Sequence, residues 1–319
     1  MTVENQNYID INNLEIREKL LKHCRLKLGD IWTDKSNRHV IACGDATDLN
    51  FLKKIFENKE PAALAIHDPP YNLVMFKTRE VSEFIKFCKK WIDNSNEFLS
   101  ENSSLYIWLG ADQRNHFKPL PEFMAMMSET EFMSRSFITM RNQRGYGTQK
   151  NWMAVRQELL YYTKGTPKFK VQYTDIPKIL RGYYKEVAGV TTENMERSKS
   201  ENIRSSNVWV DIQQVFYRMK ENVNGCPAQK PLKAIERIIL ASSSEDETVL
   251  DFFGHSGTTI IAAEKNKRKS ISVEIDPLYC EISIRRLEHF QKTGQAGWQN
   301  NNPFEKELKE IIGTEFVAA

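Results

Sequence analysis

A strand-like segment of the chain ends in a short run of residues that can hold a flat ring. Residues 63–67 form an apolar run typical of a buried strand, and Asp68, Pro69, Pro70 and Tyr71 follow directly. Because proline has no N–H group, strand pairing cannot continue through the two prolines. A rigid turn therefore presents a carboxylate, free carbonyls and an aromatic ring at the carboxyl end of a strand, which is where ligands bind in open α/β sheets.

Such a turn suits a planar ring that carries an amine. Asp68 and the backbone carbonyl of Pro69 or Pro70 can each accept one amine hydrogen, while Tyr71 can stack on the face of the ring. A surface turn with a packed tyrosine explains the same four residues without a ligand. Alone, the tetrapeptide leaves both interpretations open.

A second candidate site lies near the other end of the chain. Residues 248–253 indicate a buried strand and residues 260–265 the start of a helix, with a glycine-containing turn between them. Glycine lets a ligand approach the backbone, and the N–H groups at a helix start favour a polar or negatively charged ligand. Ser256 or Thr258 can instead cap that helix. The next strand, 270–273, ends at Glu274, where an acid can bind the two hydroxyls of a ribose.

The elements that must position these residues alternate in type. The sequence predicts strands at 39–43, 104–109, 132–140 and 155–163, a helix from residue 81 to 92 and another from 232 to 240, and a covering helix at 277–292. This alternation predicts a parallel sheet with helices on its faces. Asp45 follows the strand at 39–43, where it can cap the next helix or contact a ligand at the sheet edge.

Composition restricts the class of protein. With 319 residues, 40% hydrophobic and 27% charged, the chain has the make-up of a soluble globular protein. No apolar run is long enough to span a bilayer and no secretory signal opens the chain, so we expect a cytoplasmic protein. The five cysteines are scattered and the six histidines lack ligand spacing. We therefore expect neither a disulfide framework nor a metal site.

Positive charge is concentrated in one part of the chain. Residues 141–230 hold sixteen Lys and Arg against eight Asp and Glu, whereas the remaining residues are slightly acidic. A basic segment on an acidic body suits a polyanionic partner, although a solvated lysine-rich loop region has the same composition. Within that segment, residues 141–149 are predicted to form a mobile loop, and residues 164–225 break the α/β alternation.

Taken together, these motifs resemble those of the β group of S-adenosylmethionine-dependent DNA amino-methyltransferases, over roughly residues 38–290. The resemblance assigns catalysis to the tetrapeptide, the cofactor loop to the glycine turn, the ribose contact to Glu274, and a contact to the cofactor adenine to Asp45. Lys230, in the segment 227–231, is assigned to the methionine end of the cofactor. The residues it implies are Asp68, Pro69, Pro70 and Tyr71 for catalysis and Asp45, Lys230, Phe253, Gly254, His255, Ser256, Gly257, Thr258 and Glu274 for the cofactor.

The resemblance also implies an architecture. We expect an α/β fold: a Rossmann-like methyltransferase sheet with helices on both faces, circularly permuted, with a small DNA target-recognition lobe. The expected parts are an N-terminal arm (1–37), the catalytic half of the methyltransferase domain (38–164), the target-recognition lobe (165–225), the cofactor-binding half (226–292) and a C-terminal tail (293–319).

The implied activity is methyl transfer from S-adenosylmethionine to N6 of an adenine flipped out of duplex DNA. Adenine is favoured because members acting on cytosine N4 more often begin the tetrapeptide with serine; cytosine N4 stays open as an alternative. A dinucleotide oxidoreductase would leave the tetrapeptide unexplained, and a non-catalytic nucleic-acid-binding module would bind DNA without methylating it. A homodimer and a cognate restriction endonuclease stay open as partners. The residues expected to contact DNA are Lys77, Arg79, Arg141, Arg144 and Lys150.

One residue departs from the family's pattern. His255 stands where the cofactor loop usually has glycine. A side chain at this position predicts either crowding of the cofactor or an unfavourable backbone angle, with Gly254 absorbing the strain. The expected chemistry does not require His255 as a general base.

Overall fold

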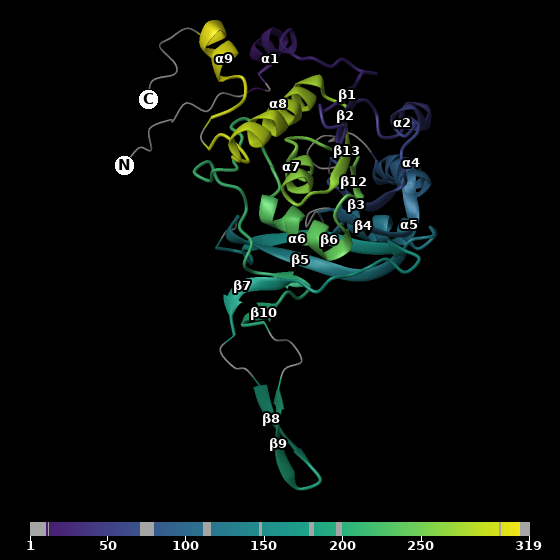
Figure 1. The fold of residues 1–319 in the computed structure, drawn as a ribbon, viewed down its shortest axis with the longest axis vertical. Coiled ribbons are helices and arrows are strands. Elements are labelled where there is room, and N and C mark those ends of the chain that lie inside the picture. Colours follow the sequence, from purple (N-terminus) through teal and green to yellow (C-terminus); the bar gives the residue numbers. More distant parts are fainter. Residues whose placement is uncertain are drawn as a thin grey trace.

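The computed structural model describes residues 11, 13–70, 80–110, 116–146, 149–178, 182–195, 200–299 and 301–312. Its centre is a nine-stranded mixed sheet with helices on both faces (Figure 1). The strands follow one another across the sheet in the order β1 (Ile31–Thr33), β2 (His39–Cys43), β13 (Lys269–Glu274), β12 (Thr248–Asp251), β3 (Ala62–His67), β4 (Leu99–Trp108), β6 (Ala154–Lys164), β5 (Met133–Tyr146) and β11 (Val208–Trp209).

Five neighbouring strands, β2, β13, β12, β3 and β4, run parallel, so their carboxyl ends lie along one edge. From β12 the chain passes through a helix to β13 on one side, and from β3 it passes through another helix to β4 on the other. The switch point of the sheet therefore lies between β12 and β3, where ligands bind in open α/β sheets. This places the ends of the two predicted ligand-binding strands beside each other.

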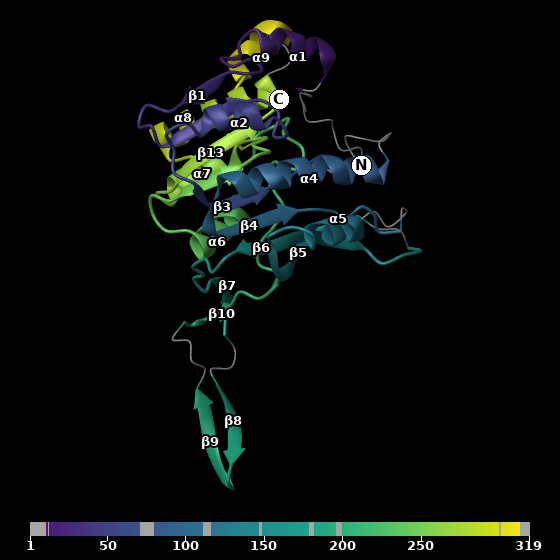
Figure 2. The same cartoon turned by 90° about the vertical axis from the view of Figure 1, so that its right-hand side faces the viewer.

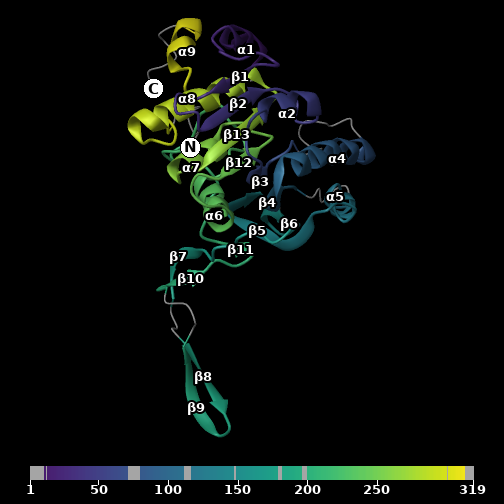
Figure 3. The same cartoon turned by 45° about the vertical axis from the view of Figure 1, so that its right-hand side comes forward.

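Helices cover both faces of the sheet, as predicted (Figure 3). On one face lie α2 (Leu49–Ile55), α4 (Val81–Phe98) and α5 (Leu120–Met127), which bury side chains such as Phe51, Trp91 and Phe123. The other face is packed by α6 (Leu232–Ser242), α7 (Thr258–Lys265) and α8 (Pro277–Thr293). Near the termini, α1 (Leu14–Leu21) and α9 (Glu305–Ile312) pack with α8 in a separate apolar cluster.

The sheet beyond β4 differs from the sequence prediction. We predicted parallel strands throughout, but β6 pairs antiparallel with both β4 and β5. We also predicted a loop at 141–149, whereas β5 continues to Tyr146. Local sequence could not reveal this, because the extension depends on pairing with β6 at Arg141 and again at Tyr146, across an irregularity in the register.

Residues 165–225 hold short strands and no described helix. β7 (Tyr173–Pro177) pairs with β10 (Asn202–Arg204), and β8 (Gly182–Val187) pairs with β9 (Val190–Met195). The β8–β9 hairpin projects far from the body of the molecule (Figure 2). By contrast, β11 joins the central sheet through β5. Among the described helices, none is long and apolar enough to cross a membrane.

A buried histidine ties β3 to β12 at the switch point. The Nδ1 atom of His67 accepts the backbone N–H of Phe252 at 3.1 Å, and its Nε2 lies 2.9 Å from the Ser95 hydroxyl on α4. Because Nδ1 is an acceptor, Nε2 carries the ring proton. Complete burial lowers the pKa of His67 to about 3, so the ring is neutral at pH 7.

This histidine predicts a pH dependence of stability. Unfolded histidine binds a proton near pH 6.5, whereas folded His67 resists protonation down to about pH 3. Below about pH 6.5 the unfolded chain therefore binds more protons at this position, and His67 lowers stability by about 1.4 kcal/mol per pH unit as the pH falls toward 3. His67→Gln keeps an acceptor and a donor but does not titrate. In urea unfolding between pH 6.5 and 4.5, the wild type should lose stability more steeply than the variant; parallel pH profiles would contradict the neutral, buried ring.

Candidate active site

Two distant parts of the chain meet at the carboxyl end of β3. Asp68 follows that strand, and its Oδ2 lies 2.6 Å from Nζ of Lys230, which lies just before α6. Both side chains are largely buried, with 28% of Asp68 and 12% of Lys230 exposed. Nζ of Lys230 also lies 5.3 Å from the ring centroid of Trp108, within cation–π range. The pair brings a predicted catalytic residue into contact with a predicted cofactor residue.

The rest of the tetrapeptide is only partly described. Pro69 is buried and Pro70 half-buried, next to Asp68 at the sheet edge. Tyr71 lies outside the described residues.

The turn after β12 is closely packed against its neighbours. The N–H of Gly254 donates to the carbonyl of Val273 on β13 at 2.9 Å, and a Cβ on Gly254 would lie 2.3 Å from Oγ of Ser272. Gly257 has a φ of 75°, and a Cβ there would lie 2.8 Å from Oγ of Ser283 on α8. Both positions therefore require glycine, so the turn keeps bare backbone at the sheet edge.

The hydroxyl groups of the turn are buried but do not cap α7. The N-cap position is Gly257, which has no side chain to accept a hydrogen bond. Thr258 Oγ1 and the carbonyl of Ser256 instead accept from Nη1 of the buried Arg286, at 3.1 and 2.7 Å. The capping interpretation of these two residues was therefore wrong. Phe253, ahead of the turn, packs its ring against Trp91, with centroids 5.3 Å apart.

Glu274 holds the same turn from the end of β13. Its Oε2 accepts the N–H of His255 at 2.8 Å, and its Oε1 accepts the N–H of Asp276 at 2.9 Å. Burial raises the pKa of Glu274 to about 7. The carboxylate thus fixes the backbone at His255 while lying at the edge shared by β2, β13 and β12.

His255 takes the strained backbone angle that its side chain predicted. Its φ is 41°, in the left-handed region that costs a non-glycine residue about 1–2 kcal/mol. Gly254 was expected to absorb this strain, which was wrong: Gly254 is not among the residues with positive φ. The His255 ring lies 4.4 Å from that of Tyr279, centroid to centroid. Burial, followed by the charges of Lys230 and Arg286, lowers the pKa of His255 to about 4, so the ring is neutral at pH 7.

Asp45 lies on an exposed turn after β2. Its neighbour Gly44 donates its N–H to the carbonyl of Glu274 at 2.9 Å, so Asp45 belongs to the same sheet edge. Its Oδ1 accepts the N–H of Thr47, while Asp48 caps α2 by accepting the N–H of Phe51. The capping role that we considered for Asp45 belongs to Asp48.

Sequence reasoning missed Asp251, the last residue of β12. It is 5% exposed, and burial raises its pKa to about 7. Its Oδ1 accepts the N–H of Phe253 at 2.9 Å, and Asp68 also raises its pKa. The sequence signal that could have identified Asp251 is an acidic residue at the end of an otherwise apolar strand.

The residues expected to contact DNA are spread over several segments. Arg141 on β5 is exposed, and so is Lys150 in the turn before β6. Arg144 belongs to β5, but its side chain lies outside the described part of the chain, as do Lys77 and Arg79 altogether.

Comparison with known proteins identifies the family to which the chain belongs. A family model for N6/N4 DNA methylases matches residues 62–285, which include both candidate motifs. The chain belongs to the DNA methylase family. Its members are S-adenosylmethionine-dependent DNA amino-methyltransferases, so the recognition made from the motifs is confirmed.

Individual relatives agree with this assignment. The chain is 28% identical to the type II methyltransferase M.HpaI of Haemophilus parainfluenzae over 78% of this chain and 74% of that protein. It is also 28% identical to the DNA adenine methyltransferase YhdJ of Escherichia coli (strain K12), over 77% of this chain and 81% of that protein.

Solved structures share the fold. M1.HpyAVI, solved with S-adenosylmethionine, superposes with a TM-score of 0.53 at 19% identity, covering 77% of this chain and 98% of that one. The cytosine-N4-specific PvuII DNA methyltransferase gives a TM-score of 0.54 at 20% identity, covering 79% and 86%.

The packing of the glycine turn predicts unequal costs at two glycines with almost the same backbone angle. Gly257 and Gly294 have φ values of 75° and 73°, but a Cβ at Gly294 would have no heavy atom within 4 Å. Gly294→Ala should cost about 1 kcal/mol through the left-handed backbone. Gly257→Ala should cost a further 1–3 kcal/mol, because its methyl group meets Ser283. Urea unfolding measures both free energies; equal losses would contradict the close packing of the turn against α8.

Proposed function

We propose that this chain methylates N6 of adenine in duplex DNA, with S-adenosylmethionine as the methyl donor. The observation that carries the proposal is the 2.6 Å contact between Asp68 and Lys230. It joins the acceptor carboxylate at the end of β3 to the segment assigned to the cofactor, beside the bare glycine turn that follows β12. In parallel sheets this switch point is the expected ligand site.

Catalysis is proposed to rest on the positions of a few acceptors. S-adenosylmethionine supplies a methyl group on a sulfonium; the S–CH3 bond breaks as the N–CH3 bond forms, neutral S-adenosylhomocysteine leaves, and the nitrogen releases one proton to solvent. The exocyclic amine is a poor nucleophile because its lone pair is delocalised into the ring. Asp68 and the carbonyl of Pro69 or Pro70 accept the two amine hydrogens, which favours a pyramidal nitrogen and directs its lone pair at the methyl carbon. Holding the two reactants in this geometry supplies most of the acceleration.

The same edge offers a cradle for the cofactor. Gly254 and Gly257 leave backbone bare where a long nucleoside must pass, and Glu274 is assigned to the ribose hydroxyls. Each Glu274 oxygen already accepts one backbone N–H, and a carboxylate oxygen retains a further lone pair for a hydroxyl. Asp45 is assigned to the adenine amine and Lys230 to the methionine end. The loop is completed by Phe253, His255, Ser256 and Thr258. Neutral His255 is proposed to line the cofactor site and not to act as a base.

DNA binding is proposed to involve base flipping. An amine inside the duplex cannot reach the donor, so the base must leave the stack at a cost of a few kcal/mol, part of which Tyr71 recovers by stacking. Phosphate contacts are assigned to Lys77, Arg79, Arg141, Arg144 and Lys150. The lobe at 165–225 is assigned to sequence recognition. A cognate restriction endonuclease is proposed as a partner from the resemblance to the family. The proposal of a homodimer likewise rests on the resemblance to the family.

The choice of base is tested by product analysis. Asp68 at the start of the tetrapeptide and the similarity to YhdJ favour adenine, whereas the fold is shared with a cytosine-N4-specific enzyme. Duplex DNA and duplex RNA should be incubated separately with methyl-labelled S-adenosylmethionine and digested to nucleosides. We expect label in N6-methyl-2′-deoxyadenosine from DNA. Label in N4-methyl-2′-deoxycytidine would overturn the assigned base, and label from RNA alone would overturn the assigned substrate.

The role of Asp68 is tested by truncation. Asp68→Ala removes an acceptor of the target amine and should lower methyl transfer by 100-fold or more, while the affinity for S-adenosylhomocysteine stays within a few-fold. Asp93→Ala is the matched control, because Asp93 on α4 is also paired with a lysine, Lys89, at 2.9 Å. Turnover by Asp68→Ala at the rate of Asp93→Ala would refute the assignment.

A further inference from the structure

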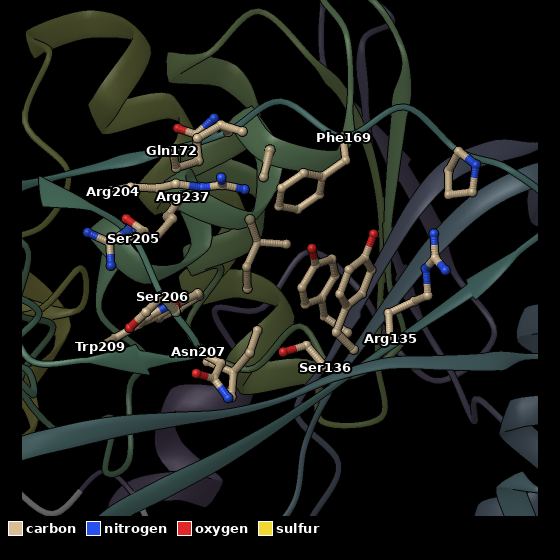
Figure 4. A pocket seen from close by; sticks show the side chains of 17 residues that line it. Arg135, Ser136, Phe169, Gln172, Arg204, Ser205, Ser206, Asn207, Trp209 and Arg237 are labelled. Carbon is tan, nitrogen blue, oxygen red and sulfur yellow. The ribbon is translucent and has the colours of Figure 1, made fainter. Parts of the chain in front are cut away.

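A cavity of about 400 Å³ lies away from the switch point, on the α6 face of the sheet (Figure 4). Its floor is formed by Ile138 of β5 and Ile238 of α6, both buried. Its walls come from residues 167–172, ahead of β7, and from residues 204–209, which run from the end of β10 to β11. Its size is within the range of small-molecule sites.

The walls are fixed in place by backbone hydrogen bonds. Lys170 donates its N–H to the carbonyl of Ala241 at the end of α6, at 2.7 Å. The N–H of Ser205 donates to the carbonyl of Gln172 at 2.9 Å, joining the two wall segments, and the N–H of Thr139 on β5 donates to Asn207 at 2.8 Å. The cavity is therefore preformed, so a ligand need not order its walls.

Aromatic rings line one side of the cavity. Tyr106 and Tyr161 stack with centroids 4.2 Å apart and an interplanar angle of 5°. Phe169 lies 6.2 Å from Tyr161, centroid to centroid, and is 55% exposed, so its ring is accessible to a ligand. Figure 4 shows the Phe169 side chain extending over the cavity. A planar ligand ring can pack against its exposed face.

The charge of the lining is entirely positive. Arg135, Arg204 and Arg237 line the cavity, and no acidic side chain does so among the described residues. Arg237 is neutralised by Asp211 behind the wall, with Nη1 and Oδ1 3.0 Å apart. In the described part of the chain, neither Arg135 nor Arg204 forms an ion pair. A phosphate would supply the missing negative charge and the acceptors that arginine binds in pairs.

Among the described residues that line the cavity, Ser205 has a buried hydroxyl group without a hydrogen-bond partner. The hydroxyl oxygen of Ser205 is inaccessible to solvent and has no hydrogen-bond partner in the described structure. Ser205 follows Arg204 directly and lines the same cavity. Because this oxygen is closed off from solvent, a ligand in the cavity does not reach it, and Arg204 supplies the polar contact at this end.

From these features we propose that the cavity binds a nucleotide. The base packs beside Phe169 over the Tyr161 side of the cavity, and the phosphate binds at Arg204. This site is separate from the proposed active site and does not depend on the proposed function. Figure 4 shows Arg204 and Arg135 on opposite sides of the aromatic rings. A free mononucleotide has one phosphate and needs Arg204 alone, whereas a DNA strand has phosphates on both sides of each base and would use both arginines.

The proposal is tested by calorimetric titration of the full chain with AMP and, separately, with a short single-stranded oligodeoxyadenylate. Excess S-adenosylhomocysteine is present to fill the proposed cofactor site. We expect Arg204→Ala to weaken AMP binding by tenfold or more, as for the loss of a hydrogen bond to a charged group. Phe169→Ala should weaken it by about fivefold or more through lost stacking. Both side chains are exposed, so the variants should fold.

Lys53→Ala is the control, because it removes one exposed positive charge from α2 on the opposite face of the sheet. If Arg135→Ala weakens binding of the oligonucleotide but not of AMP, the occupant is a DNA strand. If it weakens binding of neither, the occupant is a free mononucleotide.

Binding of neither ligand, or equal affinities in Arg204→Ala and Lys53→Ala, would overturn the proposal. So would inorganic phosphate binding as tightly as AMP, because the ring would then contribute nothing. Since methylation is not the readout, a failed methylation assay would leave this result intact.

Discussion

The parallel pairing of β12 with β3 is the constraint on which the rest of the site depends. It aligns Val249 with Leu64 and Leu250 with Ala65, so both strands end at the same edge. His67 extends this alignment by accepting the N–H of Phe252, 185 residues away in sequence. As a result, the turn that carries Asp68 and the glycine turn after β12 leave the sheet side by side. A shift of one residue would turn one strand's core side chains to the other face.

The electrostatics of this edge follow from that geometry. The Asp68–Lys230 pair and the half-buried carboxyl group of Glu274 lie at the same edge as the buried carboxyl group of Asp251. Burial raises the pKa of both Asp251 and Glu274 to about 7, whereas His255 is kept neutral. A cationic methyl donor suits such a site, because its charge would favour the ionised carboxylates that burial alone disfavours.

Much of this arrangement could be predicted from sequence. Apolar periodicity located α4 and the strands around both motifs, and strand–turn order located the glycine turn and Glu274. The antiparallel β5–β6 pair could not be predicted, because pairing direction depends on tertiary contacts and not on local composition. The same holds for the Asp68–Lys230 pair, 162 residues apart, and for the packing of Gly257 against Ser283. Asp45 and Asp48 differ by three positions, which is within the error of placing a helix start from sequence.

The central claim is that one sheet edge holds the cofactor and faces it toward Asp68. A crystal structure of the chain with S-adenosylhomocysteine tests this most directly. We predict that the ribose hydroxyls bind Glu274, that the nucleoside lies along the Gly254–Gly257 backbone, and that the sulfur faces the Asp68 side of the switch point. A cofactor bound at another edge of the sheet, or one whose sulfur faces away from Asp68, would contradict it.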